Sequence, residues 1–236
     1  MNVIDMKVVR LLIKVKILIC VGLVSCDFES NNICTDERTE EYELYDYYID
    51  KYGNEGIVAY VSNSPHTKFA IAISADESFE SWGPMGLCLY KAEKPSDEAE
   101  IPEYGVAMHQ IMKSIGIEKF PAQKWCDKKN GEENVPRAGS WRLPTKRELI
   151  LIARQTELNS ALNNIDGTPI NTDNMYWTCV EDIDGYIRID DAESDYDPEN
   201  RAVVINFEKE AYGNKDRWIK KNKYYVRAIK YIYYEE

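Results

Sequence analysis

The order of the local sequence patterns restricts the fold more than any other feature, because helical signals occupy the middle of the chain and strand signals lie on both sides. The sharpest helix start is at Thr145, whose side chain can cap the amide of Glu148 while the Glu148 carboxylate reaches back, as in a capping box. Pro144, directly before the cap, excludes an earlier helical turn. Helices enclosed by strands predict an α+β domain whose N- and C-terminal strands pair in one sheet.

Further runs follow the two periodicities of helix and strand. Residues 56–61 and 69–74 are apolar and β-favouring, and the turn-forming residues between them predict a hairpin. We expect small antiparallel or mixed sheets together with two or three short helices. Helical patterns occur at 106–115, from Pro121 onward, after Thr145 and at 159–165, and further strand patterns occur at 176–179, 185–189, 202–207 and 224–233.

The charge balance argues against a nucleic-acid partner. The 236 residues hold 29 Lys plus Arg against 41 Asp plus Glu, which gives a formal net charge of −12, and such a body repels phosphate backbones. Hydrophobic residues make up 44% of the chain, enough to bury a core. His66 and His109 are the two histidines, so motifs with clustered histidines are absent, and we expect both side chains at the surface.

The N-terminus has the layout of a secretory signal, with a basic stretch at 7–16 followed by an apolar run at 17–24. That run is too short for a membrane-spanning helix, which needs roughly 20 apolar residues. The junction Leu23-Val24-Ser25-Cys26 resembles the lipobox of bacterial lipoproteins. The competing interpretation is an ordinary secreted protein with a stray cysteine at the cleavage site.

The lipobox resemblance implies that the Cys26 sulfur carries a diacylglyceryl group and that its new amine is acylated, for example with palmitate. Two or three acyl chains anchor a protein stably. We therefore expect a signal peptide over 1–25, a lipidated cysteine with an acidic solvated tether over 26–53, and a folded domain over 54–236. The expected location is the bacterial outer membrane, and acids such as Asp27 and Glu29 favour exposure on its outer surface.

Four segments of the body, taken in order, are similar to the Lcl C-terminal domain family, which is common in exported bacterial lipoproteins. The most specific segment is the Trp-Arg-Leu-Pro-Thr-x-x-Glu-Leu block. The resemblance covers roughly residues 53–233 and implies a C-type-lectin-like fold, related to that of formylglycine-generating enzymes. It implies a structural role for Trp141, Arg142, Leu143, Pro144, Thr145, Glu148 and Trp177. The four segments are 120–126, 139–149, 176–181 and 225–230.

The cysteines argue against an enzyme of the related oxidase type. Formylglycine-generating enzymes bind copper through a cysteine pair near the C-terminus, and the Tyr225-to-Ala228 stretch has no cysteine. Phosphate-binding loops, nucleophile elbows and zinc-protease motifs are also absent, so we expect no catalysis. The four cysteines of the mature body allow three pairings. We favour unpaired core thiols at Cys126 and Cys179, with one disulfide, involving Cys88, as the alternative. The four are Cys34, Cys88, Cys126 and Cys179.

An acidic run between 181 and 199 could supply the oxygen ligands that calcium takes, although its spacing matches no EF-hand loop. A solvated acidic loop is the competing interpretation. Calcium is the one cofactor considered. The residues of this candidate site are Asp182, Asp184, Asp190 and Asp191.

The resemblance implies a ligand surface in the irregular loops of the C-terminal half, where ligands of this fold usually bind. Tyrosine gives a large rigid contact area with a hydroxyl group. The alternative is that Tyr186 and Tyr212 pack on the sheet and the others are ordinary surface residues. The candidates are Tyr186, Asp190, Tyr196, Asn200, Tyr212, Asn214 and Trp218.

These features together indicate a surface lipoprotein whose lectin-like domain recognises an extracellular protein or glycan without making or breaking a bond. Its membrane contact is expected to run through the N-terminal lipid. The alternative is a structural or accessory subunit of a cell-surface assembly.

Overall fold

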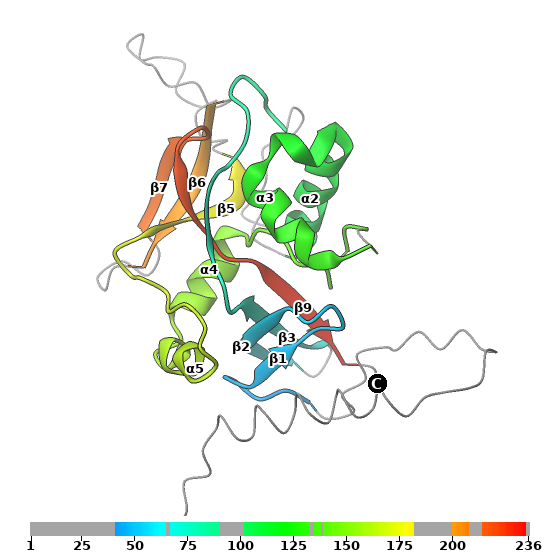
Figure 1. The fold of residues 1–236 in the computed structure, drawn as a ribbon, viewed down its shortest axis with the longest axis vertical. Coiled ribbons are helices and arrows are strands. Elements are labelled where there is room, and N and C mark those ends of the chain that lie inside the picture. The colour runs from blue at the N-terminus through cyan, green and yellow to red at the C-terminus, as the bar shows by residue number, and fades with distance from the viewer. Residues whose placement is uncertain are drawn as a thin grey trace, which may run out of the picture. The chain divides into compact units, whose positions relative to one another are not determined.

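The computed structural model describes residues 41–64, 67–89, 102–132, 135–137, 139–181, 200–207 and 214–234. This part of the chain forms an α+β arrangement of two small sheets and four α-helices (Figure 1). The predicted class is therefore confirmed. Four α-helices replace the expected two or three.

The first sheet has four strands and joins the two ends of the described chain. Its order is β1-β2-β3-β9, and every neighbouring pair is antiparallel. Strands β2 and β3 form the predicted hairpin, and β9 pairs along β3 from Ile73↔Ile229 to Phe69↔Tyr233. The predicted pairing of N- and C-terminal strands is thus confirmed. The strands are β1 (Tyr47–Ile49), β2 (Glu55–Ser64), β3 (Thr67–Ser74) and β9 (Ile229–Tyr233).

The second sheet has five strands in the order β4-β8-β5-β6-β7 and is mixed, because β5 and β8 are parallel while the other pairs are antiparallel. Strands β4 and β7 were not predicted. The strands are β4 (Ser78–Ser81), β5 (Met175–Glu181), β6 (Arg201–Asn206), β7 (Asn214–Ile219) and β8 (Lys223–Val226).

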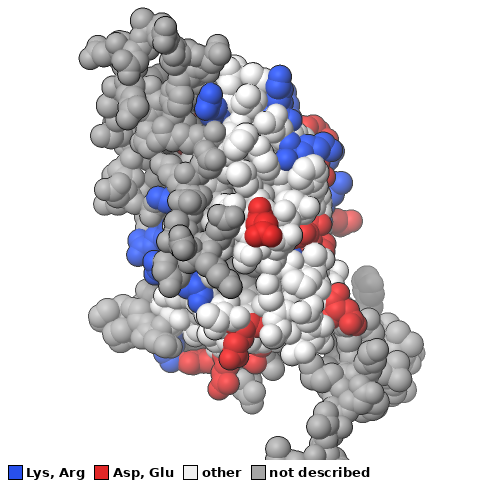
Figure 2. Space-filling view, turned by 90° about the vertical axis from the view of Figure 1, so that its left-hand side faces the viewer, with Lys and Arg blue, Asp and Glu red and all other residues white. Residues whose placement is uncertain are grey.

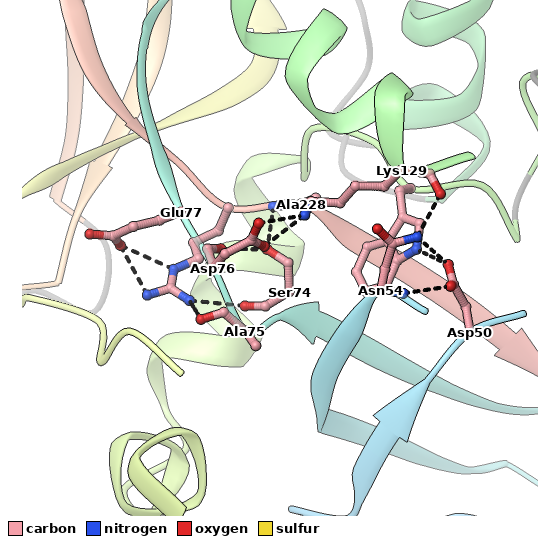
Figure 3. Close-up of polar contacts among 10 residues, drawn as sticks. Asp50, Asn54, Ser74, Ala75, Asp76, Glu77, Lys129 and Ala228 are labelled. Carbon is pink, nitrogen blue, oxygen red and sulfur yellow. Dashed lines mark hydrogen bonds and ion pairs between the residues drawn. The ribbon is translucent and has the colours of Figure 1, made fainter. Parts of the chain in front are cut away.

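The strand predicted over 224–233 is two strands, β8 and β9, which belong to different sheets. In Figure 1 the red end of the chain runs from the sheet of β5–β7 toward β3. The two strands part at Arg227, which is buried and whose Nη1 donates to the carbonyl oxygens of Ser74 and Ala75 at 2.9 and 3.1 Å. Its Nε lies 3.1 Å from a carboxylate oxygen of Glu77. The guanidinium therefore fixes the crossover between the sheets (Figure 3).

The helices lie between the strand regions in sequence, as predicted. Helix α2 is longer than the predicted 106–115 because it begins at Pro102, a residue well suited to the first helical turn. Helix α3 begins at the predicted Pro121, and α4 follows the predicted cap. The elements are α2 (Pro102–Gly116), η1 (Ile117–Lys119), α3 (Pro121–Asp127), η2 (Lys128–Asn130), α4 (Lys146–Ala153) and α5 (Leu158–Asn164).

The folded domain begins before residue 54, so the predicted tether is too long at its C-terminal end. Strand β1 pairs with β2, and the side chains of Tyr42 and Tyr48 are buried. Buried Asp50 accepts hydrogen bonds from the Asn54 side chain at 2.8 Å and the Trp141 indole at 2.7 Å (Figure 3). The acidic, tyrosine-rich composition resembled a solvated segment, but the Asp50 carboxylate is buried and accepts a hydrogen bond from Trp141, 91 positions away.

Both faces of the four-stranded sheet are buried, because alternate residues enter two different clusters. Val58 and Ala72 pack with α2 and α3 residues around Trp141. Ile57 and Ile73 face the opposite way and pack with Leu149 and Ile152 of α4 and with α5. Because side chains on both faces are buried, the sequences of β2 and β3 are nearly continuous apolar runs.

Within the described residues, no helix combines the length and apolar character required to cross a bilayer.

Two of the described cysteines are free thiols that lie in the core. Cys126 and Cys179 are buried, as predicted, while Cys88 is partly exposed. Burial raises the pKa of Cys179 to about 12, so its thiolate form is suppressed at neutral pH. Cys34 lies outside the described residues.

We expect a thiol reagent to reach Cys126 and Cys179 only after unfolding, because both side chains are buried. Peptide mass spectrometry after alkylation with and without urea measures this. Fast native labelling at Cys126 or Cys179 would contradict their place in the core.

Candidate functional site

The Trp-Arg-Leu-Pro-Thr block forms the capped start of α4. The amide of Glu148 donates to Thr145 Oγ1 at 3.3 Å, and the amide of Thr145 donates to Glu148 Oε2 at 2.7 Å. This is the predicted reciprocal capping box. The carbonyl of Pro144 accepts from the amide of Cys179 at 2.8 Å, which attaches the helix start to β5.

Glu148 also forms a buried ion pair with Arg142. The two carboxylate oxygens accept from Arg142 Nη2 at 2.6 Å and Nη1 at 2.9 Å, and the hydroxyl of Tyr231 donates to Oε1 at 2.9 Å. Arg142 and Glu148 are both at most 1% exposed. Helix α2 makes room for the guanidinium at Gly105, where an added Cβ would lie 2.4 Å from Arg142 Nη1. One carboxylate therefore caps α4 and ties it to β9.

The electrostatics of this pair predict a loss of stability in acid. Burial alone would raise the pKa of Glu148, but Arg142 and the hydrogen bonds to the carboxylate lower it below its ordinary value of 4.5. The folded protein therefore binds a proton at Glu148 less tightly than the unfolded chain does. The ionised Glu148 carboxylate stabilises the fold fully above about pH 4.5, and this stabilisation is lost as the pH falls through the folded-state pKa.

The free energy of unfolding, measured in urea between about pH 6 and about pH 3, is expected to fall in acid. Glu148→Gln should flatten the part of this fall that Glu148 causes. An unchanged pH profile in Glu148→Gln would contradict the lowered pKa.

The tryptophans of the motif are likewise buried and bonded. Trp141 Nε1 donates to Asp50 at 2.7 Å, and Trp177 Nε1 donates to the carbonyl oxygen of Glu80 at 2.9 Å. Leu143 is fully buried, and its amide donates to the Gln123 side chain at 3.0 Å. The motif residues hold helices and sheets together, which is the structural role that the sequence predicted.

His109 is buried, which corrects the prediction that it lies at the surface. Its Nε2 is 2.7 Å from Asp127 Oδ1, and neither side chain is more than 4% exposed. Lys113 Nζ lies 3.6 Å from the other Asp127 oxygen. The sequence carried a usable signal, since His109 lies three residues before the buried Met112 on the same face of α2. His66 lies outside the described residues.

A second buried ion pair lies where β5 ends and β7 turns toward β8. Lys220 Nζ is 2.5 Å from Glu181 Oε1 and 2.8 Å from the carbonyl oxygen of Leu87. The side chains of Lys220 and Glu181 are 0% and 2% exposed. Glu181 begins the acidic run of the sequence, whereas Lys220 was not predicted to be buried, because nothing in the local sequence marks a lysine for burial.

Two of the predicted ligand residues lie next to this pair. The side chain of Asn200 accepts from the amide of Gly86 at 2.6 Å. Trp218 pairs with Ala202 across β6 and β7 and packs edge-on against Tyr224, with ring centroids 5.6 Å apart. Trp218 is partly buried, so only part of its ring can meet a ligand.

Asn214 is not close to these residues, because it pairs with Asn206 at the opposite end of β6. The predicted set therefore does not form one patch in the described chain. The remaining candidates lie outside the described residues: Tyr186, Asp190, Tyr196 and Tyr212 of the ligand set, Asp182, Asp184 and Asp191 of the calcium set, and the lipidation residue Cys26.

In the described ranges, no group of three or more His, Cys, Asp or Glu side chains is placed to hold a metal ion. In each ion pair described above, the two side chains bond mainly to each other and to backbone groups. These pairs therefore hold in place the chain segments from which the loops start, and they leave a surface between those segments.

Comparison with known proteins gives a likeness to a solved structure. No family model and no curated protein matches the chain. A fimbrial protein from Bacteroides ovatus has a similar solved structure, with a TM-score of 0.57 and 14% sequence identity. The likeness covers 80% of this chain and 48% of that protein, so the chain spans about half of its length. At this identity the likeness concerns the fold alone.

Proposed function

We propose that this chain is a lipid-anchored protein of the bacterial outer surface whose α+β domain binds an extracellular protein or glycan without catalysis. The observation that carries the proposal is the likeness of 80% of the chain to a fimbrial protein. The signal-like N-terminus and the lipobox-like Cys26 support export and anchoring. The Lcl-type, C-type-lectin-like assignment belongs to the same proposal and rests on the four sequence segments.

Charge on the described surface fits this class of partner better than a polyanion. Figure 2 shows basic side chains mostly along the upper and left-hand parts of one face and acidic ones mostly in its lower and right-hand parts. A protein that binds a phosphate backbone would instead need a continuous basic surface.

A binding screen of the soluble body, residues 27–236, against host glycans and matrix proteins tests the adhesin role. Saturable binding to one class of ligand would support it. A blank screen would favour the second candidate below and count against the first.

The second candidate is a structural or accessory subunit of a surface assembly, and the fimbrial likeness favours it as well. It predicts that a stoichiometric partner co-purifies from native membranes. Recovery of the protein alone, with saturable binding in the screen, would eliminate it.

The anchor is tested separately with Cys26→Ala, which is expected to release the protein from membranes because the acceptor sulfur is lost. The matched control is Cys20→Ala, in the apolar run before the lipobox. A Cys26→Ala protein that remains membrane-bound would contradict lipidation.

A further inference from the structure

Lys220 is a lysine without contact with water, which is rare in folded proteins. Its ammonium lies 2.5 Å from Glu181 Oε1, 2.8 Å from the carbonyl oxygen of Leu87 and 4.7 Å from the centre of the Trp82 ring. A carboxylate, a carbonyl oxygen and an aromatic face are the groups that attract a bound cation. The ammonium therefore occupies a cation site built by the protein.

Four separate segments meet around this site. Glu181 ends β5, and its second oxygen accepts from the amide of Leu89 at 2.8 Å. The backbone amide of Lys220 donates to the Asn200 carbonyl at 2.8 Å, and the Lys220 carbonyl accepts from the Trp82 amide at 2.9 Å. Segment 82–89 and the end of β5 thus contact the ammonium, while the start of β6 bonds to the backbone of the same lysine.

We propose that Lys220 is a built-in cation, whose ammonium takes the place of a bound metal ion and holds segment 82–89 against the ends of β5 and β6. Assembly of this end of the five-stranded sheet then needs no divalent cation. A buried carboxylate without a counter-charge is strongly destabilising, so Glu181 makes the site dependent on the lysine. The inference goes beyond the proposed function and does not depend on it, because stability and amide exchange are measured without any ligand.

Chemical rescue provides the test. Lys220→Ala is expected to lower the melting temperature by about 10 °C, the shift typical of a broken buried ion pair in a domain of this size. Propylammonium chloride replaces the four atoms removed beyond Cβ, and we expect it to restore part of the loss in Lys220→Ala but not to shift wild type. Propanol, which lacks the charge, should not rescue. The matched control is Lys221→Ala, which removes an exposed neighbouring lysine and should melt like wild type.

Amide hydrogen exchange at Gly86 and Leu89 tests the independence from metal. In wild type we expect protection of both amides to be the same in EDTA and in millimolar calcium or magnesium, and in Lys220→Ala we expect it to be lost. If Lys220→Ala does not fold, the double variant Lys220→Met/Glu181→Gln is used, and it should recover more stability than Lys220→Met alone because the unpaired charge is gone.

Three results would overturn the proposal. They are a Lys220→Ala protein as stable as Lys221→Ala, a rescue by propylammonium no greater than that by propanol, and protection of Gly86 and Leu89 in wild type that requires a divalent cation.

Discussion

Replacing Arg142 with methionine is expected to reduce the free energy of unfolding by about 3–5 kcal/mol, because it leaves the Glu148 carboxylate buried without its counter-charge. That carboxylate accepts two hydrogen bonds from Arg142, and both residues are at most 1% exposed. The loss would loosen the start of α4 and the contact with Tyr231 of β9 together. Urea unfolding monitored by tryptophan fluorescence measures the change.

The matched control is Arg147→Met, on the exposed side of the same helix, which should stay within about 0.5 kcal/mol of wild type. The double variant Arg142→Met/Glu148→Gln should recover part of the loss, because no unpaired charge remains. If Arg142→Met were as stable as Arg147→Met, the ion pair would not hold α4 to the sheet.

Replacing Arg227 with methionine is expected to cost about 3–5 kcal/mol as well, for a different reason. The guanidinium donates to the carbonyl oxygens of Ser74, Ala75 and Thr168, and all three hydrogen bonds would be lost in the interior. Glu77 would also lose its ion-pair partner, at 3.0 Å. Because Arg227 lies where β8 passes into β9, the two sheets should lose their fixed junction.

Hydrogen exchange measures that effect directly, and the amides of Ser74 and Ala228 should exchange faster in Arg227→Met than in wild type. Ser74 donates its amide to the Ala228 carbonyl at 2.9 Å and the Ala228 amide donates to Ser74 Oγ at 3.2 Å, so both amides report on the junction. Lys223→Met, an exposed position at the start of β8, is the control and should leave exchange and stability unchanged. Unchanged exchange in Arg227→Met would show that the junction is held by packing alone.

The local patterns predicted the helices and the terminal sheet well, because those signals depend on neighbouring residues. The capping box at Thr145 and the hairpin of β2 and β3 are set by spacing and turn residues that lie within a few positions of each other. The structural role of the Trp-Arg-Leu-Pro-Thr block was an implication of the family resemblance, and its residues cap α4 and bond within the core.

The features that escaped prediction depend on contacts between distant positions. The run 224–233 is uniformly β-favouring, but it divides between two sheets at Arg227, which bonds to the carbonyl oxygens of the distant Ser74 and Ala75. Strand β1 was assigned to a tether because its acidic surroundings suggest solvent, whereas Asp50 is bonded to Trp141. Edge strand β7 has the sequence Asn-Lys-Asp-Arg-Trp-Ile, with three consecutive charged residues in place of an apolar run. A hydrophobicity pattern therefore does not detect it.

The candidate site was predicted least well, because burial of charge has no local signature. Lys220 and Glu181 are 39 positions apart, and His109 and Asp127 are 18 positions apart, yet each pair is buried. Asn200 and Asn214 were grouped by their place in the C-terminal half, but β6 separates them by its full length.

The central claim, that loops of the C-terminal half recognise an extracellular ligand, is tested most directly by binding of a variant without the 182–199 segment. Glu181 and Ala202 are paired neighbours on β5 and β6, so a short Gly-Asn-Gly turn can join the two strands without disturbing the sheet. The measurement is equilibrium binding of the 27–236 body and of this variant to the ligand found in the screen. We predict saturable binding by the wild type and at least a tenfold weaker affinity, about 1.4 kcal/mol, in the variant at an unchanged melting temperature. Equal affinity of the two proteins would contradict the account.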